Sequence, residues 1–238
     1  MTRTKIGLMV GSANTSVERN FRNTVPDSIS LHGARMTLIG GDADAIRAMD
    51  PEIDSCAEHL GSAAVDLIVF GSTAGTLIGG AGYDQAVSQR IAARAGGIPT
   101  IATSTAVLEA LAALGLKRIS LVTPYVEEVT NLIADFLIDN GHDVVSRAGR
   151  GLGSTLAFGD DPLPAIIGFV TAHVDDRADG VFLSCTNWRG MDVVQHLEDA
   201  IGKPVVTSNQ ATVWATLGRL GLAASTGYGR LMAVTPSQ

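Results

Sequence analysis

The stretch Asp66-Leu-Ile-Val-Phe-Gly-Ser-Thr-Ala74 decides the fold, because the chain repeats its pattern at Asp179-Gly-Val-Phe-Leu-Ser-Cys-Thr-Asn187. Each copy is a short apolar run, typical of a buried strand, that ends in a small residue with a nucleophilic side chain. A Gly-x-Pro turn follows in both copies, at Gly97-Ile-Pro99 and at Gly202-Lys-Pro204. After a second short strand, each copy enters a helix through a Thr-Ser pair. The repeat therefore predicts two related α/β units.

The repeat also predicts where a ligand binds. Ser72 and Cys185 hold equivalent positions, each at the carboxyl end of a strand. Open α/β sheets bind ligands at that edge, and two related lobes normally face each other with these edges at a common cleft. We therefore expect Ser72 and Cys185 to lie on opposite walls of one pocket. Convergence of two unrelated α/β units on one pattern is the alternative explanation of the repeat.

Strands and helices alternate along the rest of the chain, which indicates parallel sheets covered by helices on both faces. Helix-period apolar residues predict helices at 105–114 and 125–140, with further helices at 51–60, at 192–200 and starting near Val17. Short β-branched runs predict strands at residues 5–10, 35–39, 66–70, 100–103, 118–123, 143–146, 180–184 and 204–207.

Composition and charge narrow the classes of function. The 238 residues include 17 Lys and Arg against 24 Asp and Glu, a net charge of −7, which argues against nucleic acid or an anionic membrane surface as the main partner. The longest uncharged stretch, 67–83, is shorter than the roughly 20 residues of a membrane helix and is broken by glycines. The two cysteines fit no disulfide framework, so we expect a cytoplasmic protein. The five histidines are scattered, and we expect no metal site.

Cys185 is the main candidate for chemistry. It lies between an apolar strand and the helix predicted at 192–200, where backbone N–H groups lower the pKa of a thiol and make its thiolate usable. A buried, inert cysteine is the alternative. We favour that alternative for Cys56, which falls inside the helix predicted at 51–60.

Two loops and one aromatic residue offer binding groups. Gly71-Ser-Thr-Ala-Gly75 lacks the lysine of a phosphate loop, but its small residues and the hydroxyls of Ser72 and Thr73 suit a small anion. In the loop 11–18, Asn14 can donate to a carboxylate, whereas Thr15 or Ser16 would only cap a helix. Tyr125 follows the strand at 118–123 and either reaches the pocket or packs in the core.

Several motifs, taken in order and at fitting spacing, resemble the aspartate/glutamate racemase superfamily. Within it they resemble the branch of maleate cis-trans isomerase, arylmalonate decarboxylase and the ectoine-utilisation proteins. The resemblance covers nearly the whole chain. The motifs are Gly11-Ser-Ala-Asn-Thr15, Asp66–Thr73, Gly80-Ala-Gly-Tyr83, Ser104-Thr-Ala106, Thr123-Pro-Tyr125, Leu183-Ser-Cys-Thr-Asn187 and Ala211-Thr-Val-Trp214.

The resemblance implies an α/β fold of two pseudo-symmetric, doubly wound parallel-sheet lobes with the active site in the cleft between them. The first lobe would comprise residues 1–115 and 213–238, and the second lobe residues 116–212. Members of this superfamily use neither a metal nor an organic cofactor, and they commonly form dimers or larger assemblies. We therefore expect a homo-oligomer that needs no cofactor and acts on a small carboxylate.

The resemblance also assigns residues to roles. Two cysteines that face each other across the substrate act as acid and base in such enzymes. Cys185 matches the second thiol, Tyr125 the substrate-binding phenol and Asn14 the carboxylate-binding amide. Thr73 matches a carboxylate-binding hydroxyl of the decarboxylase. We add Thr155, Thr186 and the backbone around Thr186 to the expected carboxylate-binding groups.

Ser72 departs from this pattern, because isomerases and racemases carry cysteine at that position. We expect an isomerase or racemase of the maleate isomerase type, since Asn14-Thr-Ser-Val-Glu18 resembles the isomerase sequence. A single-thiol decarboxylase that reprotonates a carbanion through Cys185 is the alternative. A deliberate replacement of cysteine by serine at position 72 and a non-catalytic binding module are two further explanations.

Overall fold

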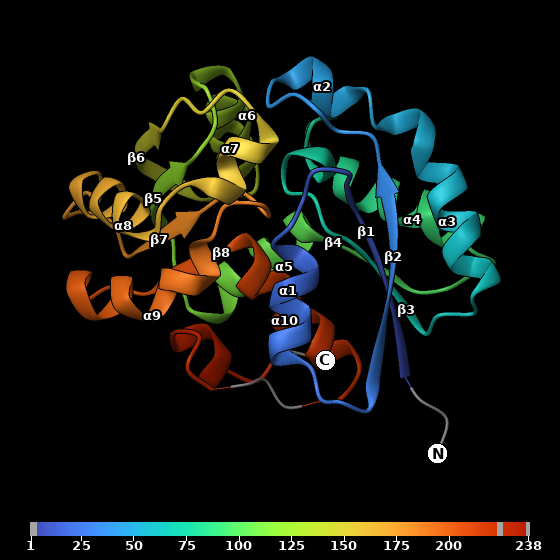
Figure 1. Cartoon of the computed structure of the whole chain (residues 1–238). Coiled ribbons are helices and arrows are strands. Elements are labelled where there is room, and N and C mark those ends of the chain that lie inside the picture. The colour runs from blue at the N-terminus through green and yellow to red at the C-terminus, as the bar shows by residue number, and fades with distance from the viewer. Residues whose placement is uncertain (1–3, 223–225, 237–238) are drawn as a thin grey trace.

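The computed structural model describes residues 4–222 and 226–236, and it contains two four-stranded parallel sheets (Figure 1). The outermost residues of the predicted first lobe, 1–3 and 237–238, lie outside this description. The first sheet has the order β2-β1-β3-β4 and the second has the order β6-β5-β7-β8. The predicted α/β fold with two doubly wound parallel sheets is therefore confirmed. The strands are β1 (Thr4–Gly11), β2 (Ile29–Met36), β3 (Leu67–Phe70), β4 (Thr100–Ala102), β5 (Arg118–Thr123), β6 (Asp143–Gly149), β7 (Gly180–Leu183) and β8 (Val205–Thr207).

The two sheets are built in the same way. The central strands β3 and β7 are buried along their whole length, as expected for parallel strands covered on both faces. An aspartate at the start of each repeat holds the neighbouring strand by its backbone. Asp66 accepts the N–H of Lys5 at 2.7 Å, and Asp179 accepts the N–H of Arg118 at 2.8 Å.

Helices cover both sheets, and two of them join the lobes. α5 and α10 end the two repeats and pack against each other, and α10 is buried from Ser208 to Leu217. The α-helices are α1 (Val17–Thr24), α2 (Ala43–Arg47), α3 (Ile53–Ser62), α4 (Tyr83–Arg94), α5 (Thr103–Ala113), α6 (Glu127–Asp139), α7 (Thr155–Asp160), α8 (Leu163–Ala172), α9 (Gly190–Ile201) and α10 (Ser208–Arg219). Single 3₁₀ turns lie at Asp50–Glu52, Ala74–Thr76 and Arg230–Ala233.

One predicted strand is wrong. The sequence predicted a strand at 35–39, but β2 spans Ile29–Met36. β2 is an edge strand and is only partly buried, so its polar residues and Gly33 hide the apolar pattern. Leu38 and Ile39 lie beyond its end, where Ile39 is 79% exposed. The other predicted elements occur, with ends shifted by a few residues.

Two side chains, those of Glu198 and Gln210, hold the backbone of the segment that follows α10. Glu198 in α9 accepts the N–H groups of Val205 and Arg230, and Gln210 donates to the carbonyl of Tyr228. No helix within the described ranges is long and apolar enough to cross a membrane.

Candidate active site

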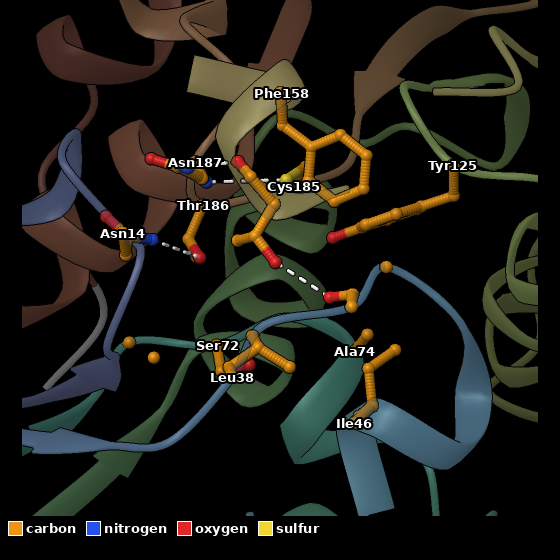
Figure 2. A pocket seen from close by; sticks show the side chains of 15 residues that line it. Asn14, Leu38, Ile46, Ser72, Ala74, Tyr125, Phe158, Cys185, Thr186 and Asn187 are labelled. Carbon is orange, nitrogen blue, oxygen red and sulfur yellow. Dashed lines mark hydrogen bonds between the residues drawn. The ribbon is translucent and has the colours of Figure 1, made fainter. Parts of the chain in front are cut away.

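A small cavity lies between the carboxyl ends of the two sheets (Figure 2). Cys185 and Ser72 line it from opposite sides, each just after the central strand of its sheet. Asn14, Tyr125, Thr155 and Thr186 also line it, so the structure brings together six of the seven predicted site residues. The remaining lining residues are Gly11, Leu38, Gly40, Gly41, Ile46, Gly71, Ala74, Phe158 and Asn187.

The backbone presents the sulfur of Cys185 to the cavity in an unusual conformation. The φ angle of Cys185 is 150°, which residues with a side chain rarely adopt and which costs about 1–3 kcal/mol. The Asn187 N–H donates to the sulfur at 3.3 Å, and the Trp188 N–H also donates to it. Burial nevertheless raises the pKa of the Cys185 thiol to about 11, although Tyr125 and these two N–H groups lower it. In neutral solution Cys185 is therefore a protonated thiol.

Tyr125 reaches the cavity from the turn between β5 and α6. The Thr123 hydroxyl accepts the Tyr125 N–H at 3.2 Å, and the Tyr125 ring packs edge-on against Phe158 at 5.2 Å between centroids. The phenol points toward the Cys185 sulfur, and it lowers the pKa of that thiol. Burial, and then the sulfur, raise the pKa of Tyr125 well above its ordinary value, so the phenol is a hydrogen-bond donor at physiological pH.

Ser72 faces Cys185 without a base to activate it. Its Oγ accepts the backbone N–H of Gly75 at 3.2 Å, and no histidine is among the described residues that line the cavity. Gly75 is required here, because a Cβ at that position would lie 2.7 Å from the Ser72 Oγ. A serine hydroxyl without a neighbouring base is a hydrogen-bonding group and a weak nucleophile.

Asn14 caps the helix that follows its loop, a role that the sequence predicted for Thr15 or Ser16. Its Oδ1 accepts the N–H groups of Ser16 and Val17, both at 3.0 Å, and so caps α1. Neither Thr15 nor Ser16 caps the helix through its side chain. The Asn14 Nδ2 donates to the Thr186 Oγ1 at 3.1 Å, and its second N–H remains for a ligand. Asn14 is thus held rigidly beside Thr186.

The cavity is small, and its described lining is uncharged. None of the described residues that line it carries a formal charge, so hydroxyl, amide and backbone N–H groups must meet the charge of any anion. Its free volume is about 30 Å³, room for about two water molecules. A four-carbon diacid has eight heavy atoms, so its binding requires the walls to move apart. No group of three or more His, Cys, Asp and Glu side chains in residues 4–222 and 226–236 could hold a metal ion.

A comparison with models of known protein families identifies the family of this chain. A family model described as arylmalonate decarboxylase matches residues 6–232. The chain belongs to the arylmalonate decarboxylase family. This result confirms the superfamily branch that the motifs predicted.

Relatives in this family include both isomerases and decarboxylases. The maleate isomerase of Pseudomonas putida is 30% identical over 230 residues, which are 92% of each chain. The arylmalonate decarboxylase of Bordetella bronchiseptica is 32% identical over 195 residues, which are 76% of this chain and 78% of that one. The maleate cis-trans isomerase of Nocardia farcinica, solved as a Cys-to-Ser mutant with a covalently bound succinylcysteine intermediate, has the same fold. The TM-score is 0.90 at 24% identity, over 96% of this chain and 98% of that chain.

Thr73 and Thr155 were predicted to bind the substrate, but their hydroxyl groups donate hydrogen bonds to other groups of the protein. Thr73 is not among the residues that line the cavity, and its hydroxyl donates to the Ser208 Oγ at 2.8 Å. Ser208 also accepts the Cys185 N–H at 3.1 Å, so Thr73 supports the Cys185 loop from behind. Thr155 lines the cavity, and its hydroxyl donates to the Gly40 carbonyl at 2.7 Å across the cleft.

Sequence reasoning missed several residues of the site. Leu38, Ile46 and Phe158 are apolar residues that line the cavity, but each comes from a loop or short helix without a recognisable motif. Asn187 was only part of a quoted motif, although it lines the cavity and its N–H touches the sulfur. Its role depends on contacts between segments far apart in the chain, which spacing does not reveal.

Proposed function

We propose that the protein is a cofactor-independent isomerase of a small dicarboxylate, of the maleate cis-trans isomerase type, with Cys185 as its only catalytic thiol. The observation that carries the proposal is the position of the Cys185 sulfur. It lies in a small cavity whose described lining is uncharged, where it accepts the Asn187 N–H and faces Tyr125 and Ser72. The maleate isomerase relatives support the same class of reaction.

The reaction needs only the thiol. The S–H group adds across the double bond of the diacid, so that an S–C bond forms and the proton goes to the neighbouring carbon. Rotation follows about the central carbon–carbon bond, which the addition has turned from a double into a single bond. Loss of the proton and of the sulfur then restores the double bond in the trans form and the thiol of Cys185. During addition, negative charge moves onto a substrate carboxylate, where hydrogen-bond donors stabilise it.

We assign the remaining residues around this step. Asn14 and Thr186 bind one carboxylate, with Thr155 at the edge of the site. Tyr125 donates to the sulfur whenever it carries negative charge. Ser72 occupies the position opposite the thiol and donates to the substrate, because no basic side chain among the described lining residues would make it a nucleophile.

The experiment follows the conversion of maleate to fumarate by proton NMR. We expect conversion by the unmodified protein, loss of activity in Cys185→Ala, and retention of activity in Cys56→Ala. Cys56 is the matched control, since it is a buried cysteine outside the cavity. We expect Ser72→Cys to be faster, because a second thiol then supplies the partner that the isomerase pattern has. Conversion that survives in Cys185→Ala would refute the proposal.

A decarboxylase of a malonate-type acid is the second candidate, and the apolar lining residues Leu38, Ile46 and Phe158 favour it. Apolar side chains around the cavity suit an apolar substituent beside a carboxylate. One carboxylate would leave as CO₂, its electron pair would stay on the carbon, and the protonated thiol of Cys185 would deliver a proton there. Release of CO₂ from phenylmalonate, without conversion of maleate, would replace the isomerase by the decarboxylase. Amino diacids tested for loss of optical activity cover the racemase alternative.

We further infer a cytoplasmic homo-oligomer with a small carboxylate as its ligand. Both cysteines are free, as a reducing compartment would keep them. Light scattering on the purified protein measures the oligomeric state. Binding of a carboxylate without turnover, in both the unmodified chain and Ser72→Cys, would identify a binding module.

A further inference from the structure

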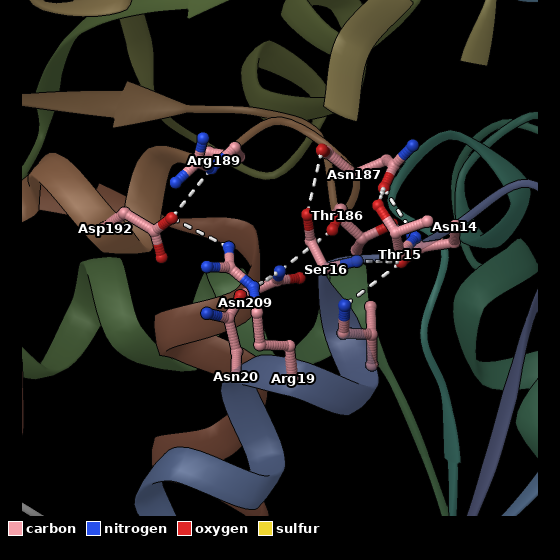
Figure 3. A network of polar contacts seen from close by, with 11 residues as sticks. Asn14, Thr15, Ser16, Arg19, Asn20, Thr186, Asn187, Arg189, Asp192 and Asn209 are labelled. Atoms are coloured by element: carbon pink, nitrogen blue, oxygen red, sulfur yellow. Dashed lines mark hydrogen bonds and ion pairs between the residues drawn. The ribbon is translucent and has the colours of Figure 1, made fainter. Parts of the chain in front are cut away.

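One buried side chain, that of Asn187, ties three separate segments together. Figure 3 shows its contact with the loop that carries Thr15. The Asn187 Oδ1 accepts the Thr15 N–H at 2.8 Å. Its Nδ2 donates to the Ala13 carbonyl at 3.2 Å and to the Thr155 carbonyl at 2.7 Å. Asn187 is only 2% exposed, so water cannot replace these partners. The donors and acceptor of this amide therefore fix the loop 13–15 and the start of α7 relative to one another.

The main chain of the same residue reaches the reacting group. The Asn187 N–H donates to the Cys185 sulfur at 3.3 Å, and its carbonyl accepts the Ser16 hydroxyl at 3.1 Å. Asn14 lies between the residues that Asn187 holds, and its own amide points at Thr186. One residue thus connects the sulfur with the amide assigned to the carboxylate.

We propose that Asn187 is a positioning residue that sets the placement of the Cys185 sulfur relative to the carboxylate-binding amide of Asn14. This inference rests on the proposed function, because it assumes that a carboxylate binds at Asn14. A shift of about 1 Å between a bound group and the reacting atom is enough to cost a large factor in rate. The Asn187 side chain touches no reacting atom, and it acts through the segments that it holds.

The test uses alkylation of Cys185, so that it does not depend on turnover. In the Cys56→Ser variant, Cys185 is the only thiol. Bromoacetate carries a carboxylate and iodoacetamide does not, whereas both alkylate a thiolate with loss of halide. The ratio of the two rates at one pH cancels the fraction of thiolate. It therefore reports how well a carboxylate is held next to the sulfur.

We expect the ratio for the Cys56→Ser protein to exceed that of free N-acetylcysteine by about tenfold or more, as expected for hydrogen bonds to a charged group. Adding Asn187→Ala should return the ratio to that of the free thiol. Gln210→Ala is the matched control. Gln210 is a fully buried amide with partners on two segments, outside the cavity, so its loss should lower stability and leave the ratio unchanged.

The outcomes separate the inference from the proposed function. A ratio in the Cys56→Ser protein no higher than that of the free thiol would reject the carboxylate site and, with it, both proposals. A raised ratio that persists in Asn187→Ala would reject the positioning role alone. An equal fall in Gln210→Ala would also reject that role, because general loosening would then explain the effect.

Discussion

The ionisation of Cys185 can be predicted in detail. Burial raises the pKa of the thiol from 9.0 to about 11, against the lowering effect of the Tyr125 hydroxyl and two backbone N–H groups. The difference corresponds to about 2.7 kcal/mol against ionisation. At pH 7, about one molecule in 10,000 then carries a thiolate. In the Cys56→Ser variant, the rate of iodoacetamide alkylation should rise about tenfold for each pH unit up to about pH 11.

Tyr125→Phe is the informative perturbation. It removes a donor to the sulfur, so the pKa of Cys185 should rise further and alkylation at pH 8 should slow. Tyr83→Phe is the control, because Tyr83 is hydrogen-bonded to Asp50 outside this cavity. The difference in thiolate absorbance near 240 nm between the Cys56→Ser protein and the same protein with Cys185→Ser measures the titration, because the signal of the tyrosines then cancels. A pKa below 9 in the unmodified site, or a fall in Tyr125→Phe, would refute the description of the thiol as buried and hydrogen-bonded.

The free energy of unfolding should also depend on pH through the ionisation of the Cys185 thiol. The pKa of Cys185 is higher in the folded protein than in the unfolded chain, so its full contribution is present below pH 9 and is lost as the pH rises to about 11. In urea titrations, the free energy of unfolding should fall over this range by about 2.7 kcal/mol more than in Cys185→Ser. Parallel pH profiles for the two proteins would contradict the shift.

Two further substitutions test the surroundings of the site. Asp161 accepts the indole N–H of Trp188 at 2.9 Å and is 5% exposed, so Asp161→Ala should lower the free energy of unfolding in urea by about 3 kcal/mol; a loss below about 1 kcal/mol would mean that this contact is dispensable. Gly75→Ala brings a Cβ to 2.7 Å from the Ser72 Oγ, and it should reduce kcat/KM by about tenfold, with a smaller effect on stability, for the substrate that the maleate and phenylmalonate assays identify. Gly168→Ala is the control, because its Cβ meets no atom within 4 Å and kcat/KM should stay unchanged.

Much of the fold was predictable because the repeat is local. The apolar runs of β3 and β7 are buried on both faces, so their sequences show little besides hydrophobic residues. β2 was misplaced because an edge strand with one partner has no such requirement. The apolar runs at the start of the two repeats therefore predicted the strands β3 and β7 of the two sheets. The position of the edge strand β2 could not be predicted from the sequence and required the structure.

The site was predictable only where a residue's place in the repeat determined its position. Cys185 and Ser72 follow equivalent strands and were expected on facing walls. The engagement of Thr73 with Ser208 joins residues from the two repeats, and no spacing rule anticipates it. The same holds for Phe158, which enters the cavity from the short helix α7.

The lack of charged groups around the cavity has a consequence for ionic strength. Sites built on arginine or lysine lose affinity for anions as salt is added, because counter-ions screen the attraction. Here the long-range field comes from a chain with a net charge of −7, and it repels an approaching dianion. Sodium chloride should therefore raise the rate at which the substrate associates, and it should leave the rate at which the bound substrate dissociates almost unchanged.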